Sequence, residues 1–273
     1  GEADFIVSFE LLEAARYTAE LKKGGKIITS TQQINPMPVI TGAAQYPDNL
    51  AEKMQAAGID GAVICNIATN ARQETKVNDF AIALNRDPVL FAFGSVHPDS
   101  PDAMQELERL QAAGLKGVKF HPEYQGFYAD DEKMKPIYKK ASELGLIVVF
   151  HAGEDYGYMP PYHATPERLA KALLWLDTPV VAAHWGSQGM GQDTIKYLCK
   201  TPIYMDTAFG YGTCPKPMQM AILEAHGVDK ILFATDCPWH SPDMELYQLD
   251  SLGLSESEKN KIKYENAKKL LKF

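Results

Sequence analysis

The sequence predicts a (β/α)₈ barrel whose first strand is missing or atypical, and three observations carry this prediction. The chain has 273 residues, close to the ~250 residues of a typical barrel of this class. From Ile59 onward, short apolar runs alternate with amphipathic helical segments. Polar residues or glycine end nearly every run, and a barrel gathers such strand ends at one face. We therefore expect one barrel domain over residues 1–273.

Seven apolar runs are the expected strands. They lack the apolar–polar alternation of half-exposed strands, which indicates strands covered on both faces. The runs are 59–68, 89–98, 115–122, 146–154, 179–186, 202–210 and 230–239. Two weaker candidates, 3–9 and 25–30, precede them. An open, doubly wound sheet is the alternative, and the lack of a G-x-G-x-x-G motif opening the repeat favours the barrel.

Amphipathic segments between the runs are the expected helices. The segments 74–87 and 131–145 carry apolar residues at i, i+3, i+4 and i+7, the pattern of one buried helix face. Thr165 and Pro166 suit the N-cap and the first turn of another helix. Left-handed C-cap residues are expected directly before three strands, at Gly58, Gly114 and Gly145.

Composition narrows the class of protein. The formal net charge is −8 at pH 7, whereas a nucleic-acid or acidic-membrane partner would favour a basic face. No apolar run reaches the ~20 residues of a membrane span, and the first residues lack the pattern of a signal peptide. The four cysteines form no C-x-x-C pair. We expect a cytoplasmic protein with a small-molecule substrate, no nucleic-acid partner and no membrane partner; a homodimer is left open.

Three polar side chains follow apolar runs in the same frame. His151 follows IVVF, His184 follows VVAA and Asp236 follows ILFAT. Strand ends of a parallel barrel meet at one face, so we expect these side chains to converge. Two imidazoles and a carboxylate suit a divalent metal, Zn²⁺ above all, and also suit proton transfer without metal. The alternative is structural, with Asp236 as the N-cap of the following helix.

Four further residues are predicted to bind substrate. Lys119 and His121 stand two apart in GVKFHP, so they share one side of an extended strand and could bind an anion. The alternative for Lys119 is an ion pair inside the barrel. His163 lies in the long loop after the fourth run, where substrate contacts are expected. Trp239, with its neighbour His240, is expected to form the pocket wall.

Several segments resemble the amidohydrolase superfamily, and most closely its amidohydrolase-related branch, which includes aminocarboxymuconate-semialdehyde decarboxylase. The segments are FHAGE (150–154) with the stretch 117–153 that leads into it, AAHWG (182–186), FATDCPW (233–239) and the closing YENAKKLL (264–271). The resemblance covers roughly Tyr46 to the C-terminus. It implies that the residues matching His151 and Asp236 bind a divalent metal. It also implies a catalytic role for the residue matching His184, near a metal-bound water.

One departure from the family concerns the metal. The family's first strand carries a His-x-His pair of ligands, whereas no histidine precedes His97 here. Catalytic zinc usually has three protein ligands, so the resemblance implies weak or absent metal in this chain. Tight metal binding would indicate that another residue replaces the pair, the candidates being Glu2, Asp4, Glu10 and Lys119.

These observations favour a metal-dependent hydrolase that acts on a small carboxylated metabolite through a metal-activated water. His184 or Asp236 would move the proton, and Lys119 and His163 would hold the anionic end. A decarboxylase or another lyase using the same site is the first alternative. The second is a non-catalytic barrel that lost its metal pair. A phosphate-binding aldolase-type barrel has only the segment 208–215 in its favour.

Overall fold

The computed structural model describes residues 3–8, 21–29, 60–237 and 239–272. Each of the seven predicted runs contains a parallel strand. These strands are β3 (Ala62–Cys65), β4 (Leu90–Phe93), β5 (Gly117–Phe120), β6 (Ile147–Phe150), β7 (Val180–Ala182), β8 (Tyr204–Asp206) and β9 (Ile231–Leu232). The two weaker candidates are also strands, β1 (Ala3–Ser8) and β2 (Leu21–Thr29), and they pair with each other in a separate parallel sheet.

The strands follow one another in sequence order, as in a (β/α)₈ barrel. Strands β5 to β9 form one five-stranded sheet, and β3 pairs with β4. A bridge between Gly94 and Val118 joins the two sheets, and the amide of Lys119 donates to the carbonyl of Gly94 at 2.8 Å. The strand ladder is open between β3 and β9 within the described residues. This opening is the place of a first barrel strand, as the sequence predicted; the single domain over 1–273 stays a prediction.

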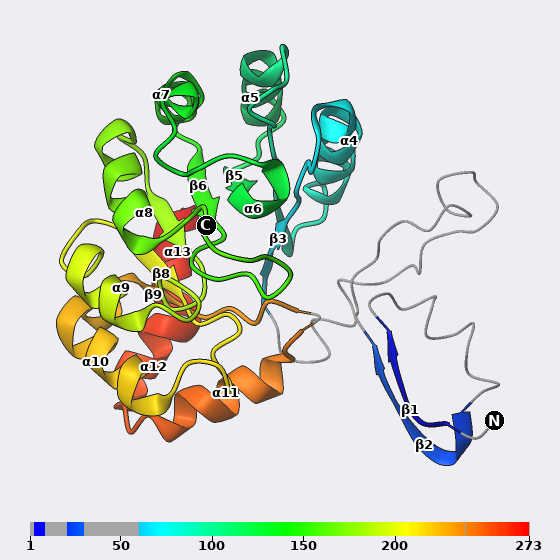
Figure 1. Ribbon diagram of the computed structural model, residues 1–273, viewed down its shortest axis with the longest axis vertical. Helices are drawn as coiled ribbons and strands as arrows, with labels where there is room; N and C mark the ends of the chain where they lie inside the picture. The colour runs from blue at the N-terminus through cyan, green and yellow to red at the C-terminus, as the bar shows by residue number, and fades with distance from the viewer. Residues whose placement is uncertain (1–2, 9–20, 30–59, 238, 273) are drawn as a thin grey trace.

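Helices follow the strands and surround them (Figure 1). They are α4 (Glu74–Leu84), α5 (Ala103–Ala112), α6 (Pro122–Gln125), α7 (Lys135–Glu143), α8 (Pro166–Ala172), α9 (Gly191–Tyr197), α10 (Lys216–His226), α11 (Pro242–Ser251), α12 (Glu256–Asn260) and α13 (Asn266–Leu271). Thr165 caps α8 by accepting from the amide of Arg168, with Pro166 in the first turn, as predicted. Gly114 and Gly145 have the predicted left-handed φ angles, and Gly58 lies outside the described residues. Within the described ranges, no helix is long and apolar enough to span a membrane.

Side chains from alternate strand positions form two apolar clusters. Val118, Val148 and Ala182 belong to the large cluster that contacts the helices. Val149 and Val181 belong to a smaller cluster inside the barrel, which includes Leu271 of α13. Because both faces of these strands are covered, the apolar runs show no alternation.

The interior face of β3 is the exception to this burial. Val63 is 42% exposed and Cys65 is also exposed, although their register partners Phe91 and Phe93 pack inside the barrel. Every residue of β5, β6 and β7 is buried. The exposure of β3 therefore marks the side of the barrel where no strand of the described residues pairs with it.

The turn after β6 requires a glycine at position 153. Gly153 has φ +88°, and an added Cβ would lie 2.3 Å from the backbone N and O of Gln188. We expect Gly153→Ala to lower the free energy of unfolding by more than ~3 kcal/mol, because a left-handed alanine costs ~1–2 kcal/mol and the backbone contact must also shift. Urea unfolding measures this loss.

Gly114→Ala is the matched control for this substitution. Gly114 has φ +84° but nothing within 4 Å of an added Cβ, so only the conformational cost of ~1–2 kcal/mol should appear. Equal losses in the two variants would show that the contact with Gln188 is relaxed at no cost.

Candidate active site

Two of the three predicted site residues meet at the carboxyl end of the barrel. His151 follows β6 and His184 follows β7, and both side chains are buried. The Nε2 atom of His184 lies 3.1 Å from the Nδ1 atom of His151. The convergence predicted for these two histidines is therefore present.

The other ring nitrogen of each histidine faces a main-chain carbonyl. Nδ1 of His184 lies 3.2 Å from the carbonyl oxygen of Ala208, and Nε2 of His151 lies 3.3 Å from that of Glu154. A carbonyl only accepts hydrogen bonds, so these nitrogens carry the protons of the neutral rings. Two lone pairs then face each other across 3.1 Å, and such a pair needs a shared proton or a cation between or beside the nitrogens.

A divalent metal fits this pair. Two nitrogens bound at ~2.1 Å to one ion lie roughly 3.0–3.4 Å apart, and metal-bound histidines usually donate their second N–H to a carbonyl or carboxylate. Burial, followed by the nearby His121 and His184, holds the pKa of His151 well below its usual value. The tautomers and the spacing of the two nitrogens therefore fit a divalent metal ion.

His121 and Asp155 lie beside His151. Nε2 of His121 is 3.4 Å from Oδ2 of Asp155, and one ligand atom from each of the three residues lies within 4.8 Å of the others. The cluster could therefore hold a divalent metal. Burial, helped by Lys119 and His184, lowers the pKa of His121 to about 2, so the ring is neutral.

Ring orientation distinguishes the donors in this cluster. His121 and His151 are stacked, with ring centroids 4.1 Å apart and an interplanar angle of 13°. Lone pairs in two parallel ring planes do not converge on one ion, whereas His151 and His184 are inclined by 63°. In addition, Nδ1 of His121 accepts the amide of Tyr124 at 3.5 Å as the N-cap of α6. The His151–His184 pair is thus the better-directed donor pair, with Asp155 as a neighbouring carboxylate.

Lys119 is a buried residue whose ammonium has no ion pair among the described residues. Its side chain is on the interior face of β5, beside Val149 in the register, and the residue is only 8% exposed. The Nζ atom makes no hydrogen bond with those residues either, so the ion pair considered as the alternative is absent there. The Lys119 charge acts at longer range on the buried Asp206 carboxyl, and a bound anion would give it a direct partner.

Asp206 is a site residue that sequence reasoning missed. It ends β8 and is buried, and its Oδ1 accepts the amides of His184 at 2.9 Å and Ala208 at 3.1 Å. These bonds hold the turn that presents His184. Burial raises the pKa of the Asp206 carboxyl. The available signal was its position at the end of an apolar run, in the same frame as the two histidines.

The other predicted residues lie around this centre. Asp236 follows β9 and is exposed; it does not cap α11, because Ser241 is the N-cap, so the capping alternative is wrong. His163 bonds through Nδ1 to the carbonyl of Pro122 at 3.0 Å. Trp239 is 51% exposed at the rim. The predicted metal pairing of His151 with Asp236 stays a prediction, as do the substrate contacts of His163 and Trp239. Glu2 and Glu10 lie outside the described residues.

Strained backbone gathers at the same strand ends. His184 and Trp185 after β7, Phe209 after β8 and Asp236 after β9 all have φ angles of +57° to +61°. Non-glycine residues rarely adopt this region, and it recurs at functional sites. The clustering supports the carboxyl face as the active site.

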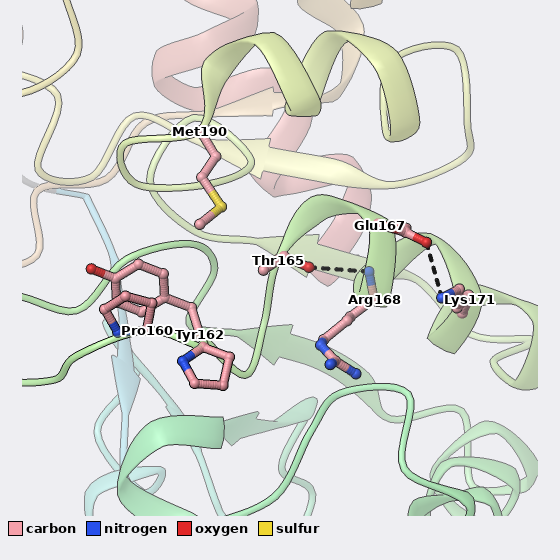
Figure 2. A pocket seen from close by; sticks show the side chains of 8 residues that line it. Pro160, Tyr162, Thr165, Glu167, Arg168, Lys171 and Met190 are labelled. Carbon is pink, nitrogen blue, oxygen red and sulfur yellow. Dashed lines mark hydrogen bonds and ion pairs between the residues drawn. The ribbon is translucent and has the colours of Figure 1, made fainter.

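A surface pocket lies next to α8 (Figure 2) and shares no lining residue with this centre. It has a volume of about 380 Å³ and is lined by residues that include Tyr162, Arg168 and Lys171. Arg168 pairs with Asp130 at 2.5 Å, and Lys171 pairs with Glu167 at 3.0 Å. Since both cations are already paired, the pocket offers no free charge to a ligand.

Comparison with known proteins decides the family. The sequence model described as amidohydrolase matches residues 33–273. The chain belongs to the amidohydrolase family. This confirms the resemblance found in the sequence and places the chain in a family of enzymes.

Solved structures similar to this amidohydrolase cover nearly the whole chain. A 2,6-dihydroxybenzoate decarboxylase with bound 2,6-dihydroxybenzoate has a TM-score of 0.65 at 17% identity, over 98% of this chain and 99% of that one. The 5-carboxyvanillate decarboxylase of Sphingomonas paucimobilis has 0.63 at 16%, over 98% of both chains. A dihydroxybenzoic acid decarboxylase of Polaromonas sp. JS666, with bound manganese, has 0.61 at 16%, over 98% and 96%. These similarities confirm the barrel fold.

Similarity to curated proteins is local. Subunit IorB of indolepyruvate oxidoreductase from Thermococcus kodakarensis is 51% identical over 47 residues, and so is its counterpart from Pyrococcus horikoshii. The match covers 17% of this chain and 23% of either subunit. The chain thus spans about a quarter of the length of these relatives.

Proposed function

We propose that this amidohydrolase is a divalent-metal-dependent decarboxylase of a small carboxylic acid that contains a planar ring. The observation that carries the proposal is the ammonium of Lys119, on a residue only 8% exposed, which has no direct ion pair among the described residues. Its charge influences both His121 and His151, which places it close to the donor cluster. A substrate carboxylate would pair with Lys119 while the rest of the substrate faces the metal-binding side chains.

Aromatic side chains around the site support a ring in the substrate. Tyr124 stacks on His121, with ring centroids 3.7 Å apart, and Tyr158 lies 5.8 Å from Tyr124. Tyr156 lies 5.9 Å from Phe209. Flat rings stack favourably on such side chains. The three similar structures described above are decarboxylases of dihydroxybenzoates and of 5-carboxyvanillate, all of which are ring-containing acids.

His151 and His184 would hold the metal, and Asp155 or Asp236 could complete the set. A divalent ion, when bound, polarises the carboxylated substrate and lowers the pKa of a bound water. Zn²⁺ suits the imidazole donors, and manganese is the ion bound in one similar structure. Asp206 keeps His184 in place, and Lys119 orients the acid.

Hydrolysis is the second candidate, because the family description is amidohydrolase. The same metal-activated water would then attack an ester, lactone or amide bond of a carboxylated ring compound. His184 or Asp236 would carry the proton. With either reaction we expect a cytoplasmic protein that acts on a small molecule. Whether it forms a homodimer is left open.

The test supplies metal and compares two products. The chain is stripped with chelator, reloaded with Zn²⁺ or Mn²⁺ and given 2,6-dihydroxybenzoate, 5-carboxyvanillate and a set of lactones and amides of ring acids. We expect metal-dependent release of CO₂. Hydrolysis products without CO₂ would select the second candidate. No turnover with any metal would support the non-catalytic barrel instead.

The metal site itself is tested apart from activity. Elemental analysis and calorimetric titration should show that His151→Ala and His184→Ala each weaken metal binding by at least ~10–100-fold. His226→Ala is the control, because His226 bonds to the carbonyl of Ile203 away from this centre. Unchanged metal binding in both site variants would contradict the assignment of the donor pair.

A further inference from the structure

The imidazole of His240, at the carboxyl face, is oriented by the buried carboxylate of Glu245. Nδ1 of His240 lies 2.5 Å from Oε1 of Glu245, and the two residues are 7% and 1% exposed. Since a carboxylate accepts, Nδ1 carries the proton and Nε2 keeps the lone pair of the neutral ring. Nε2 makes no hydrogen bond with any described residue.

Glu245 is itself fixed from two sides. It lies in the first turn of α11, and its Oε1 also accepts the amide of Tyr211 at 3.1 Å. Tyr211 belongs to the loop after β8, so the carboxylate joins two segments of the carboxyl face. A carboxylate held in this way fixes both the tautomer and the direction of the imidazole.

Aromatic contacts connect His240 to the proposed metal-binding pair. Its ring stacks on Phe209, with centroids 4.4 Å apart and an interplanar angle of 24°. Phe209 in turn lies edge-on to His184 at 6.3 Å. Tyr211 closes another side of His240 at 6.3 Å. Phe209 thus contacts both His240 and His184. Nε2 is the ring nitrogen of His240 that has no hydrogen bond among the described residues.

We propose that His240, oriented by Glu245, is a second proton-transfer residue of this site, distinct from the His151–His184 pair. The inference rests on the proposed decarboxylase function. The carboxylate of Glu245 fixes the tautomer of His240 and directs Nε2 away from itself, which is the arrangement that a proton-transfer residue needs.

The step that His240 would perform is the protonation of carbon. When CO₂ leaves, the electrons of the broken carbon–carbon bond stay on the ring carbon, which must then gain one proton. The Nε2–H bond of the His240 imidazolium breaks as the new carbon–hydrogen bond forms. Neutral His240 remains bonded to Glu245 and regains its proton from water.

His240→Asn separates this role from a structural one. The amide of asparagine can replace Nδ1 as the donor to Glu245 but supplies nothing at the Nε2 position. We expect kcat for CO₂ release to fall by ~10²-fold, while the lost stacking on Phe209 lowers the melting temperature about as much as in the control variant below. Added imidazole should restore part of the activity of His240→Ala.

His226→Asn is the matched control. His226 uses both ring nitrogens, accepting the amide of Lys200 and bonding to the carbonyl of Ile203. Its substitution should lower the melting temperature and leave kcat unchanged. If His240→Asn behaves like this control, the proposed proton transfer is wrong.

A chemical test that needs no substrate completes the experiment. Diethyl pyrocarbonate acylates accessible imidazole nitrogens, and peptide mass mapping locates the product. We expect His240 to react slowly in the folded chain through its unbonded Nε2, because the residue is only 7% exposed. The more exposed His226 should not react, because both of its ring nitrogens are bonded. If the protein releases CO₂ but His240 is unreactive or dispensable, this inference alone is wrong. If the protein shows no turnover at all, the proposed function and this inference are both wrong.

Discussion

Lys119→Met is expected to stabilise the protein and to remove most of its activity on carboxylated substrates. The substitution keeps the length and apolar stem of the side chain but deletes an ammonium that has no direct ion pair among the described residues. Removing a charge from this buried position should raise the free energy of unfolding by ~1–4 kcal/mol. Loss of the ion pair to the substrate should cost ~2–5 kcal/mol of transition-state binding, or roughly 30- to 5,000-fold in kcat/KM.

Opposite signs for stability and activity make this prediction specific. Urea unfolding gives the stability, and CO₂ release gives kcat/KM. Lys116→Met is the control, since Lys116 is exposed three positions earlier and its loss should change stability by less than ~0.5 kcal/mol. A destabilised Lys119→Met variant would show that Lys119 already has a stabilising partner, and the substrate role would lose its support.

The fold could be predicted from the sequence because burial leaves a direct trace in it. Strands β5, β6 and β7 are buried on both faces, so their runs are continuously apolar, and Thr165 with Pro166 fixes the start of α8 through local bonds. Strand pairing leaves no such trace. The runs at 3–9 and 25–30 were recognised as strand candidates, but their pairing with each other depends on contacts that periodicity does not encode.

The candidate site was predictable only where strand geometry places the residue. His151 and His184 follow consecutive parallel strands, so their meeting was expected. Asp155 lies in a loop, and its approach to His121 depends on loop conformation. The partnership of His240 with Glu245 joins a loop to the first turn of a helix. Neither loop contact has a sequence period from which it could be read.

Acid is expected to destabilise the metal-free chain through its buried histidines. Burial lowers the pKa of His121 to about 2 and that of His151 well below its usual value. The unfolded chain therefore binds protons first, near pH 6.5. The resulting stability is fully present above that pH and is lost as the pH falls. Each neutral histidine contributes up to ~1.4 kcal/mol per pH unit, so the pair gives about 2.7 kcal/mol per unit below pH ~6.

Urea unfolding in the presence of chelator, between about pH 6.5 and 5, measures this slope. The range lies above the pKa values of carboxyl groups in the unfolded chain, so those groups contribute little to it. His121→Asn removes one titrating ring and should reduce the slope by up to ~1.4 kcal/mol per pH unit. Between about pH 7.5 and 9 the two proteins should share a flat profile, because both histidines are neutral in either state. An identical slope in wild type and His121→Asn at the lower pH would mean that His121 is protonated in the folded chain. Its imidazolium would then be paired with Asp155, and the neutral donor cluster described above would have to be abandoned.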